Sequence, residues 1–71
     1  MERLTGRELE ILGMVAEGKH YDEIAQTLGI TFQTVRNHLA NARGKLGARN
    51  SPNAVLIALS LGLIKKEKVG V

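Results

Sequence analysis

The fold is decided by residues 21–40, which read YDEIAQTLGITFQTVRNHLA. Two helical patterns in this segment are joined by a turn of three residues, and helices joined so closely must cross at a steep angle. The first helix needs a small residue at the crossing, which is Ala25, and the turn needs a positive φ, which Gly29 adopts without Cβ strain. Val35 is the branched apolar residue that fills the core beneath the second helix. This spacing is the geometric signature of a helix-turn-helix.

Start signals elsewhere in the chain predict two further helices. Thr5 and Glu8 form the pattern of a capping box. Thr31 is an N-cap for the second helix of the helix-turn-helix, and Ser51 with Pro52 are the N-cap and first residue of a last helix. No stretch alternates with a period of two, so we expect no strands. The prediction is an all-α protein, a four-helix bundle with helices over about residues 6–17, 22–28, 32–46 and 52–61.

The helix predicted over residues 32–46 has two different sides at 100° per residue. We expect the apolar residues of this helix to lie in the core; they are Phe32, Val35, Leu39, Ala42 and Leu46. The opposite side carries Gln33, Arg36, Asn37, Ala40 and Gly44. Long polar side chains near the start and small residues beyond suit a helix in the major groove of DNA, where the first residues reach base edges and the backbone comes close.

Polar residues also border this exposed side. One flank carries Thr34, His38, Asn41 and Lys45, and the other carries Arg36 and Arg43. Side chains in these places are suited to the phosphates on either wall of the groove. We do not expect His38 to bind a metal, because no second ligand stands three or four residues further on.

Length and charge agree with a small DNA-binding domain. The chain has 71 residues, enough for one domain, over residues 1–64, followed by a basic and flexible tail over residues 65–71. Residues 1–30 contain three basic and six acidic side chains, whereas residues 31–71 contain seven basic side chains and one acidic. The resulting net charges of −3 and +6 suggest a polyanion partner, nucleic acid before an anionic membrane.

Other classes of function find little support. The chain has no cysteine, and it lacks a nucleophile with a base, a metal-ligand cluster and a phosphate-binding loop. We therefore expect no enzyme activity, no metal or other cofactor, and no small-molecule ligand within this chain. No apolar run approaches the ~20 residues of a membrane span, so we expect no membrane contact and a location in the cytoplasm.

Motifs occur in order from residue 4 to residue 64. They read LTxRExEIL (4–12), AxG (16–18), EIAxxLxITxxTVxxH (23–38), KLG (45–47) and AVxxAxxxGLI (54–64). In combination they resemble the LuxR-type, GerE-like helix-turn-helix domain of bacterial transcription regulators. The resemblance implies a four-helix domain that binds two-fold symmetric double-stranded DNA as a homodimer.

The resemblance also assigns roles to single residues. It implies base-edge contacts from Arg36, Asn37 and Ala40, to which the position of Gln33 on the helix adds a fourth. It implies phosphate contacts from Thr31, Thr34, His38 and Lys45, to which the flank positions add Asn41 and Arg43. Tyr21 departs from the family pattern, which has a small hydroxyl residue there, and Ala40 replaces a polar residue that some members use to read bases.

The last predicted helix is apolar nearly all round. Val55, Ala58 and Leu59 form one side, which we expect to face the core. A second side, nearly opposite, is formed by Ala54, Ile57 and Leu61. A helix with two apolar sides is buried on both, so we expect the second side to form the dimer interface.

Two alternatives remain at this point. The Leu-Thr-x-Arg-Glu start and the helix-turn-helix also occur in the promoter-binding region 4 of sigma factors, which act with RNA polymerase. A protein-interaction module that has kept the fold without DNA binding is the second. The last helix and the motif Gly62-Leu63-Ile64 weigh against the first, and the basic third helix weighs against the second.

Overall fold

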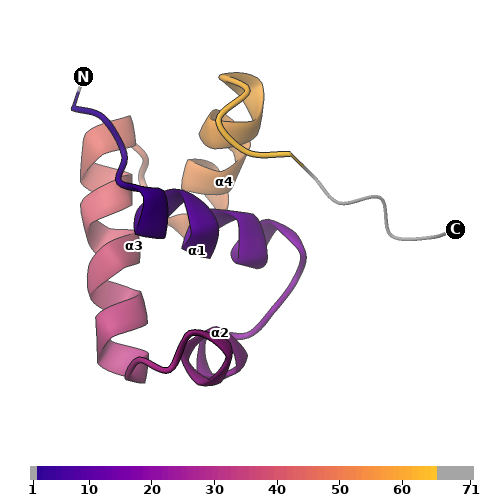
Figure 1. Ribbon diagram of the computed structural model, residues 1–71. Helices are drawn as coiled ribbons and strands as arrows, with labels where there is room; N and C mark the ends of the chain where they lie inside the picture. The colour runs from indigo at the N-terminus through magenta and orange to yellow at the C-terminus, as the bar shows by residue number, and fades with distance from the viewer. Residues whose placement is uncertain (1, 66–71) are drawn as a thin grey trace, which may run out of the picture.

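The computed structural model describes residues 2–65 and contains four helices in that range. They are α1 (Gly6–Ala16), α2 (Tyr21–Leu28), α3 (Phe32–Leu46) and α4 (Ser51–Ser60). The all-α prediction is confirmed, with bounds that differ by a single residue at four helix ends. In Figure 1, α3 stands along one side of the molecule, α1 lies across it, and α2 lies beneath α1. The predicted tail lies, apart from Lys65, outside the described residues.

The start of α1 has the predicted capping box. The Glu8 N–H donates to Thr5 Oγ1 at 3.1 Å, and the Thr5 N–H donates to Glu8 Oε1 at 2.9 Å. These two bonds satisfy donors that the first turn of a helix leaves without partners. The chain direction at the entrance to α1 is therefore fixed by Glu8.

The turn between α2 and α3 has the predicted geometry. Gly29 is left-handed with a φ of 68°, and the Ile30 N–H donates to the Ala25 carbonyl at 3.0 Å. Val35 is fully buried and Ala25 is nearly so. The two helices therefore meet through a small side chain and a branched one, as the sequence pattern requires.

The N-cap of α2 is not the residue at position 21, where the family pattern has a small hydroxyl residue. His20 is the N-cap, and its N–H donates to Glu23 Oε1 at 2.8 Å. Tyr21 is the first residue of α2, and its hydroxyl donates to Ser51 Oγ at 3.1 Å. Tyr21 thus links the start of α2 to the start of α4 instead of capping its own helix.

The prediction of Ser51 as the N-cap of α4 was wrong. Asn50 is the N-cap, and its side chain accepts the Asn53 N–H at 2.8 Å. Pro52 is compatible with an N-cap at either Asn50 or Ser51. Backbone N–H groups in the first turn of a helix have no carbonyl acceptor within the helix, so the missing N–H of proline costs nothing there. The Ser51 hydroxyl accepts the bond from Tyr21 instead.

The core is built from all four helices. Both α1 and α3 pack against every other helix, so they form its centre. The largest fully buried side chains are Ile11, Leu12, Ile24 and Val35. Leu39, Ala42 and Leu46 are also buried, as predicted for the inner side of α3. None of the helices in residues 2–65 is long and apolar enough to cross a membrane.

Phe32 is the exception to the predicted inner side of α3. It is 47% exposed, and its ring packs against that of Tyr21 with the centroids 5.9 Å apart. Phe32 is the first residue of α3, at the end of the helix's apolar side. The helical period alone does not show how far along a helix the core extends.

The two sides of α4 are also arranged differently from the prediction. Ala54 is fully buried, so its assignment to an exposed dimer interface was wrong. Ile57 is half-buried, and Leu61 lies just beyond α4 with 54% of its surface exposed. Of the side predicted to face the core, Ala58 is fully buried, but Val55 and Leu59 are only half-buried. Leu56, which belongs to neither of the predicted sides, is 62% exposed.

Candidate nucleic-acid interface

The first turns of α3 present three exposed polar side chains, those of Gln33, Arg36 and Asn37. Gln33 Nε2 donates to Asn37 Oδ1 at 2.9 Å. Residues four apart are neighbours on the surface of a helix, so this bond aligns the two side-chain amides along α3. Amides and a guanidinium together offer donors and acceptors of the kind that base edges in a major groove recognise. Ala40 is exposed on the next turn, beyond the amides.

The N-terminus of α3 is capped by Thr31. Its Oγ1 accepts the Thr34 N–H at 3.0 Å, and the two hydroxyl oxygens are 2.8 Å apart and hydrogen-bonded. Thr31 is exposed and Thr34 is half-buried. Backbone N–H groups and the positive end of the helix dipole favour an anion here, which is what a DNA phosphate would supply.

Arg36 and Arg43 lie on the same flank of α3, two turns apart. They border a hollow of about 240 Å³ whose other lining residues are Tyr21, Phe32, Leu39 and Ser51. Arg43 is half-buried, and its Nε has no hydrogen-bond partner in the part of the chain that the structure describes. No carboxylate of residues 2–65 forms an ion pair with either arginine. Their charges therefore remain available to an external anion.

The opposite flank carries His38, Asn41 and Lys45, with His38 half-buried and Asn41 exposed. Lys45 differs from the other two because its charge already has a partner. Its Nζ lies 2.9 and 3.2 Å from the two carboxylate oxygens of Glu8, and the Lys45 side chain is only 15% exposed. The pair connects the last turn of α3 to the first turn of α1.

Glu8 is the one charged residue in the core of the described chain, with an exposed fraction of 3%. Burial by itself raises the pKa of the Glu8 carboxyl. The Thr5 N–H, the hydrogen bond and charge of Lys45, and the more distant charge of His38 together outweigh burial and leave this pKa below its ordinary value of 4.5. Glu8 is therefore an anion in the folded protein at neutral pH.

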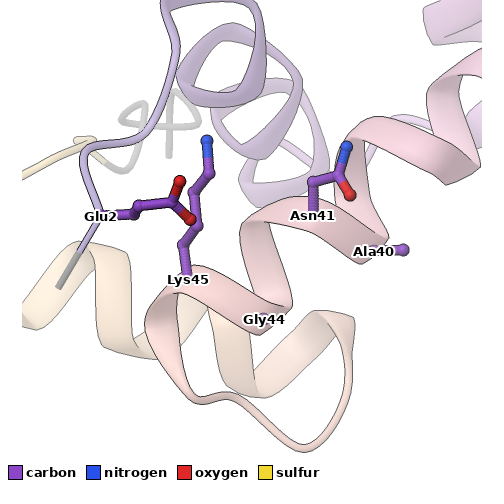
Figure 2. Close-up of a pocket in the computed structure, with 5 residues that line it drawn as sticks. All are labelled: Glu2, Ala40, Asn41, Gly44 and Lys45. Carbon is purple, nitrogen blue, oxygen red and sulfur yellow. The ribbon is translucent and has the colours of Figure 1, made fainter.

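A second hollow, of about 610 Å³, lies over the C-terminal half of α3. Figure 2 shows its lining residues, which are Glu2, Ala40, Asn41, Gly44 and Lys45. The Lys45 side chain runs from α3 toward the violet ribbon of α1, and Glu2 lies beside it on the chain that enters α1. Ala40 and Gly44 keep the helix surface low at this point. An object as large as a DNA strand could approach the α3 backbone there.

Sequence reasoning missed the pairing of Glu8 with Lys45. Each residue had a plausible separate role, Glu8 in the capping box and Lys45 on a phosphate. The two are 37 residues apart in the chain, and their contact depends on how α1 crosses α3. The sequence contains a partial signal for this contact. Glu8 lies three and four residues before Ile11 and Leu12, which places it on the inner side of α1, where an apolar side chain would be expected.

Fold and surface together define a small helix-turn-helix domain whose third helix, α3, has a polar exposed side flanked by basic residues. Residues 2–58 match the family of bacterial regulatory proteins known as the luxR family. The chain therefore belongs to the luxR family, and it is a DNA-binding domain of the type found in LuxR-type transcription regulators. The family is described as one of bacterial regulatory proteins.

Individual relatives support this assignment. The transcriptional activator protein AnoR of Acinetobacter nosocomialis is 48% identical over 61 residues, which are 86% of this chain and 26% of AnoR. The solved structure of the transcription factor GerE has a TM-score of 0.88 and 36% identity, covering 94% of this chain and all of that chain. The Vibrio cholerae VqmA dimer, solved in the absence of target DNA, has a TM-score of 0.83 and 32% identity, covering 93% of this chain and 31% of that chain. This chain thus spans about a quarter of the length of AnoR.

Stability should depend on pH through Glu8. Because its pKa is lower in the folded than in the unfolded state, the unfolded state binds the proton more tightly, and the stabilisation is lost as the pH falls below about 4.5. We expect the difference in free energy of unfolding between wild type and Glu8→Gln to be constant from pH 7 to 5 and to shrink below that. Urea titrations at a series of pH values measure it.

Glu10→Gln is the matched control, because Glu10 is an exposed residue of the same helix, paired with Arg7 at 3.2 Å. Its difference from wild type should be small throughout. A Glu8→Gln difference that is as large at pH 3 as at pH 7 would contradict the assigned direction of the Glu8 pKa.

Proposed function

We propose that this chain is the DNA-binding domain of a bacterial transcription regulator that recognises a specific double-stranded sequence with α3 in the major groove. The observation that carries the proposal is the exposed side of α3. There the hydrogen-bonded amides of Gln33 and Asn37 lie beside Arg36, and all three side chains are exposed within residues 2–65. A location on DNA in the cytoplasm and a contact with RNA polymerase belong to this proposal.

The residues of α3 divide by their place on the helix. We assign the base edges to Gln33, Arg36 and Asn37, with Ala40 against the groove floor. We assign the phosphates to the residues that border this side, which are Thr31, Thr34, His38, Asn41 and Arg43. Lys45 was predicted to belong to the second group, and its bond to Glu8 makes its role a separate question.

A homodimer through α4 completes the proposal. Pro52, Val55, Leu56 and Leu59 form an apolar surface that continues onto α1 and surrounds a hollow of about 430 Å³. A single helix-turn-helix offers few base contacts, so a second copy of the chain on this surface would double them across a two-fold symmetric site. VqmA, a structural relative of this domain, is described as a dimer with a target DNA.

Replacing Asn37 by alanine should reduce selectivity more than general affinity. We expect a loss of about 1–3 kcal/mol on the preferred sequence, because a base-edge contact is removed, and little change on scrambled DNA. The preferred sequence is first obtained by selecting bound molecules from random double-stranded DNA with the purified protein. Fluorescence anisotropy at fixed salt then gives both affinities.

Equal losses on preferred and scrambled DNA would remove Asn37 from the base-reading group. Absence of any DNA binding by the wild type, even at low salt, would favour the alternative of a protein-interaction module. Binding that requires core RNA polymerase would favour the sigma-factor alternative.

Gly44 provides a test in which stability and binding should move in opposite directions. A Cβ at Gly44 would meet nothing within 4 Å, so nothing inside the described chain requires a glycine in this part of α3. Gly44→Ala should stabilise the fold by about 0.5–1 kcal/mol through helix propensity. It should weaken DNA binding, because the added methyl group lies where the DNA comes close.

Gly13→Ala is the matched control. Gly13 is a helical glycine of α1 whose Cβ would also meet nothing within 4 Å, and it lies away from the recognition surface. It should raise the melting temperature similarly and leave DNA affinity unchanged. If Gly44→Ala stabilises the protein without weakening binding, DNA does not approach α3 closely at this residue.

A charge on the apolar surface of α4 should separate the dimer. Leu56 is 62% exposed, so Leu56→Lys should cost the monomer little stability while placing a charge in the interface. We expect sedimentation equilibrium to show a folded monomer and mobility shifts to show weaker binding to an inverted repeat. Leu61→Lys is the comparison. Leu61 is also exposed, and it belongs to the side of the last helix that was predicted from the sequence to form the dimer interface.

The DNA site offers an independent check on the dimer. Half-sites about 10 base pairs apart, centre to centre, would place two copies of α3 in successive major grooves on one face of the DNA. Inserting about five base pairs should reduce affinity to that of a single half-site, because one groove then turns to the far side. Affinity that does not depend on the spacer would show independent monomers.

A further inference from the structure

The Lys45 ammonium is enclosed in a way that the other cations of α3 are not. It donates to both carboxylate oxygens of Glu8, at 2.9 and 3.2 Å, and the pair is shielded, with 15% of the Lys45 and 4% of the Glu8 side chain exposed. Arg36 is exposed, and Arg43 has no carboxylate partner among residues 2–65. Lys45 is thus the α3 cation whose charge is already neutralised within the fold.

Moving Lys45 to a DNA phosphate would have a specific cost. Glu8 would remain in the core with its charge unpaired, retaining the Thr5 N–H at 2.9 Å as its other donor. Removing one partner of a buried ion pair is strongly unfavourable, because the other charge stays away from water. A phosphate contact made in water at the groove edge is worth much less than this.

We propose that Lys45 is a positioning residue that holds the last turn of α3 against the capped start of α1 and contacts no phosphate. This inference rests on the proposed function, because the surface positioned in this way is the one assigned to DNA. Glu8 joins three elements: the entering chain through Thr5, α1 to which it belongs, and α3 through Lys45. The carboxylate therefore fixes how the exposed face around Ala40 and Gly44 is presented.

Figure 2 agrees with this role. The Lys45 side chain extends from α3 toward α1, and the shorter Asn41 side chain rises from the same helix one turn earlier. Asn41 is exposed, so it can reach a phosphate beside the C-terminal half of α3 without losing an internal partner. Without Lys45, the groups proposed to contact DNA on this flank are Thr34, His38 and Asn41, of which Thr34 and His38 are half-buried and Asn41 is exposed.

Glu8→Gln distinguishes the two roles of Lys45 by the sign of the effect. The glutamine oxygen can still accept the Thr5 N–H, but the charge that holds Lys45 is removed. If Lys45 positions α3, affinity for the preferred DNA should fall about threefold to tenfold, because part of the cost of breaking the buried pair appears in binding. The slope of log K against log salt should not change, because no phosphate contact is lost. If Lys45 is a phosphate ligand held in reserve, its release should raise affinity and steepen the slope by about one.

Glu10→Gln is again the control, because it changes the net charge by the same amount on the same helix at an exposed residue. All Glu8→Gln values are compared with it, which cancels the long-range effect of one lost negative charge. Tighter binding with a steeper slope than Glu10→Gln would overturn the proposal. Behaviour identical to Glu10→Gln in affinity would overturn it as well.

Lys45→Met gives a second measurement if Glu8→Gln does not fold. Methionine keeps the apolar stem of the lysine and removes its charge. The control is Lys19→Met, which removes an exposed lysine whose Nζ lies 3.9 Å from Glu17 Oε1, and the two variants should have the same salt slope. A slope shallower by about one than that of Lys19→Met would show a phosphate contact and overturn the proposal. Lys45→Arg should restore affinity, since a guanidinium can also bond to both oxygens of Glu8.

Hydrogen exchange keeps the inference separate from the proposed function. Amides in the last turn of α3 should exchange faster in Glu8→Gln than in Glu10→Gln, while amides around Val35 should differ little. This comparison needs no DNA, so it remains decisive if the wild type fails to bind any sequence. Unchanged protection in the last turn would show that the pair does not hold α3.

Discussion

The burial of α3 against the other three helices is the constraint on which the rest of the structure depends. Val35, Leu39, Ala42 and Leu46 face the centre of the bundle and are contributed by one helix over its whole length. From Val35 to Leu46, α3 is buried along one side over about three turns, which fixes the orientation of its opposite side. The side with Gln33, Arg36 and Asn37 is therefore presented by a rigid element, which is what precise recognition of base edges requires.

Polar contacts refine this apolar frame. Glu8 with Lys45 holds the last turn of α3 to α1, and Tyr21 with Ser51 holds the start of α2 to the start of α4. In each case the polar groups are bonded to one another in a partly buried place, which makes the contact directional. A core of this size has few large side chains, so such contacts have more influence on helix orientation than they would in a larger domain.

The surface divides into regions with different chemistry. The exposed side of α3 is polar with free arginines on one flank, while the outer side of α4 is apolar around Leu56. An apolar patch on a small domain is costly to leave in water, and a polar, positively charged surface is not. The two regions are therefore suited to different partners, a second copy of the chain and a nucleic acid.

Local patterns predicted most of the fold correctly. The capping box of Thr5 and Glu8, the N-cap Thr31 and the left-handed Gly29 act within a few residues of chain, so their geometry follows from the sequence around them. The inner side of α3 followed from its period of 3.6 residues, and the polar outer side was correctly expected to be exposed. These are properties of single helices and their ends.

What the sequence could not determine depends on how the helices are placed on one another. On α4, every residue from Ala54 to Leu59 is apolar, so periodicity could not decide that Ala54 is buried and Leu56 exposed. Phe32 continues the apolar pattern of α3, and only the extent of the bundle shows that it lies at the edge. Lys45 has the sequence position of a phosphate ligand, and only the crossing of α1 over α3 brings it to Glu8. Sequence determined the helices and their caps because those interactions are local, and tertiary structure decided which charge and which apolar face remain free because those depend on contacts between distant residues.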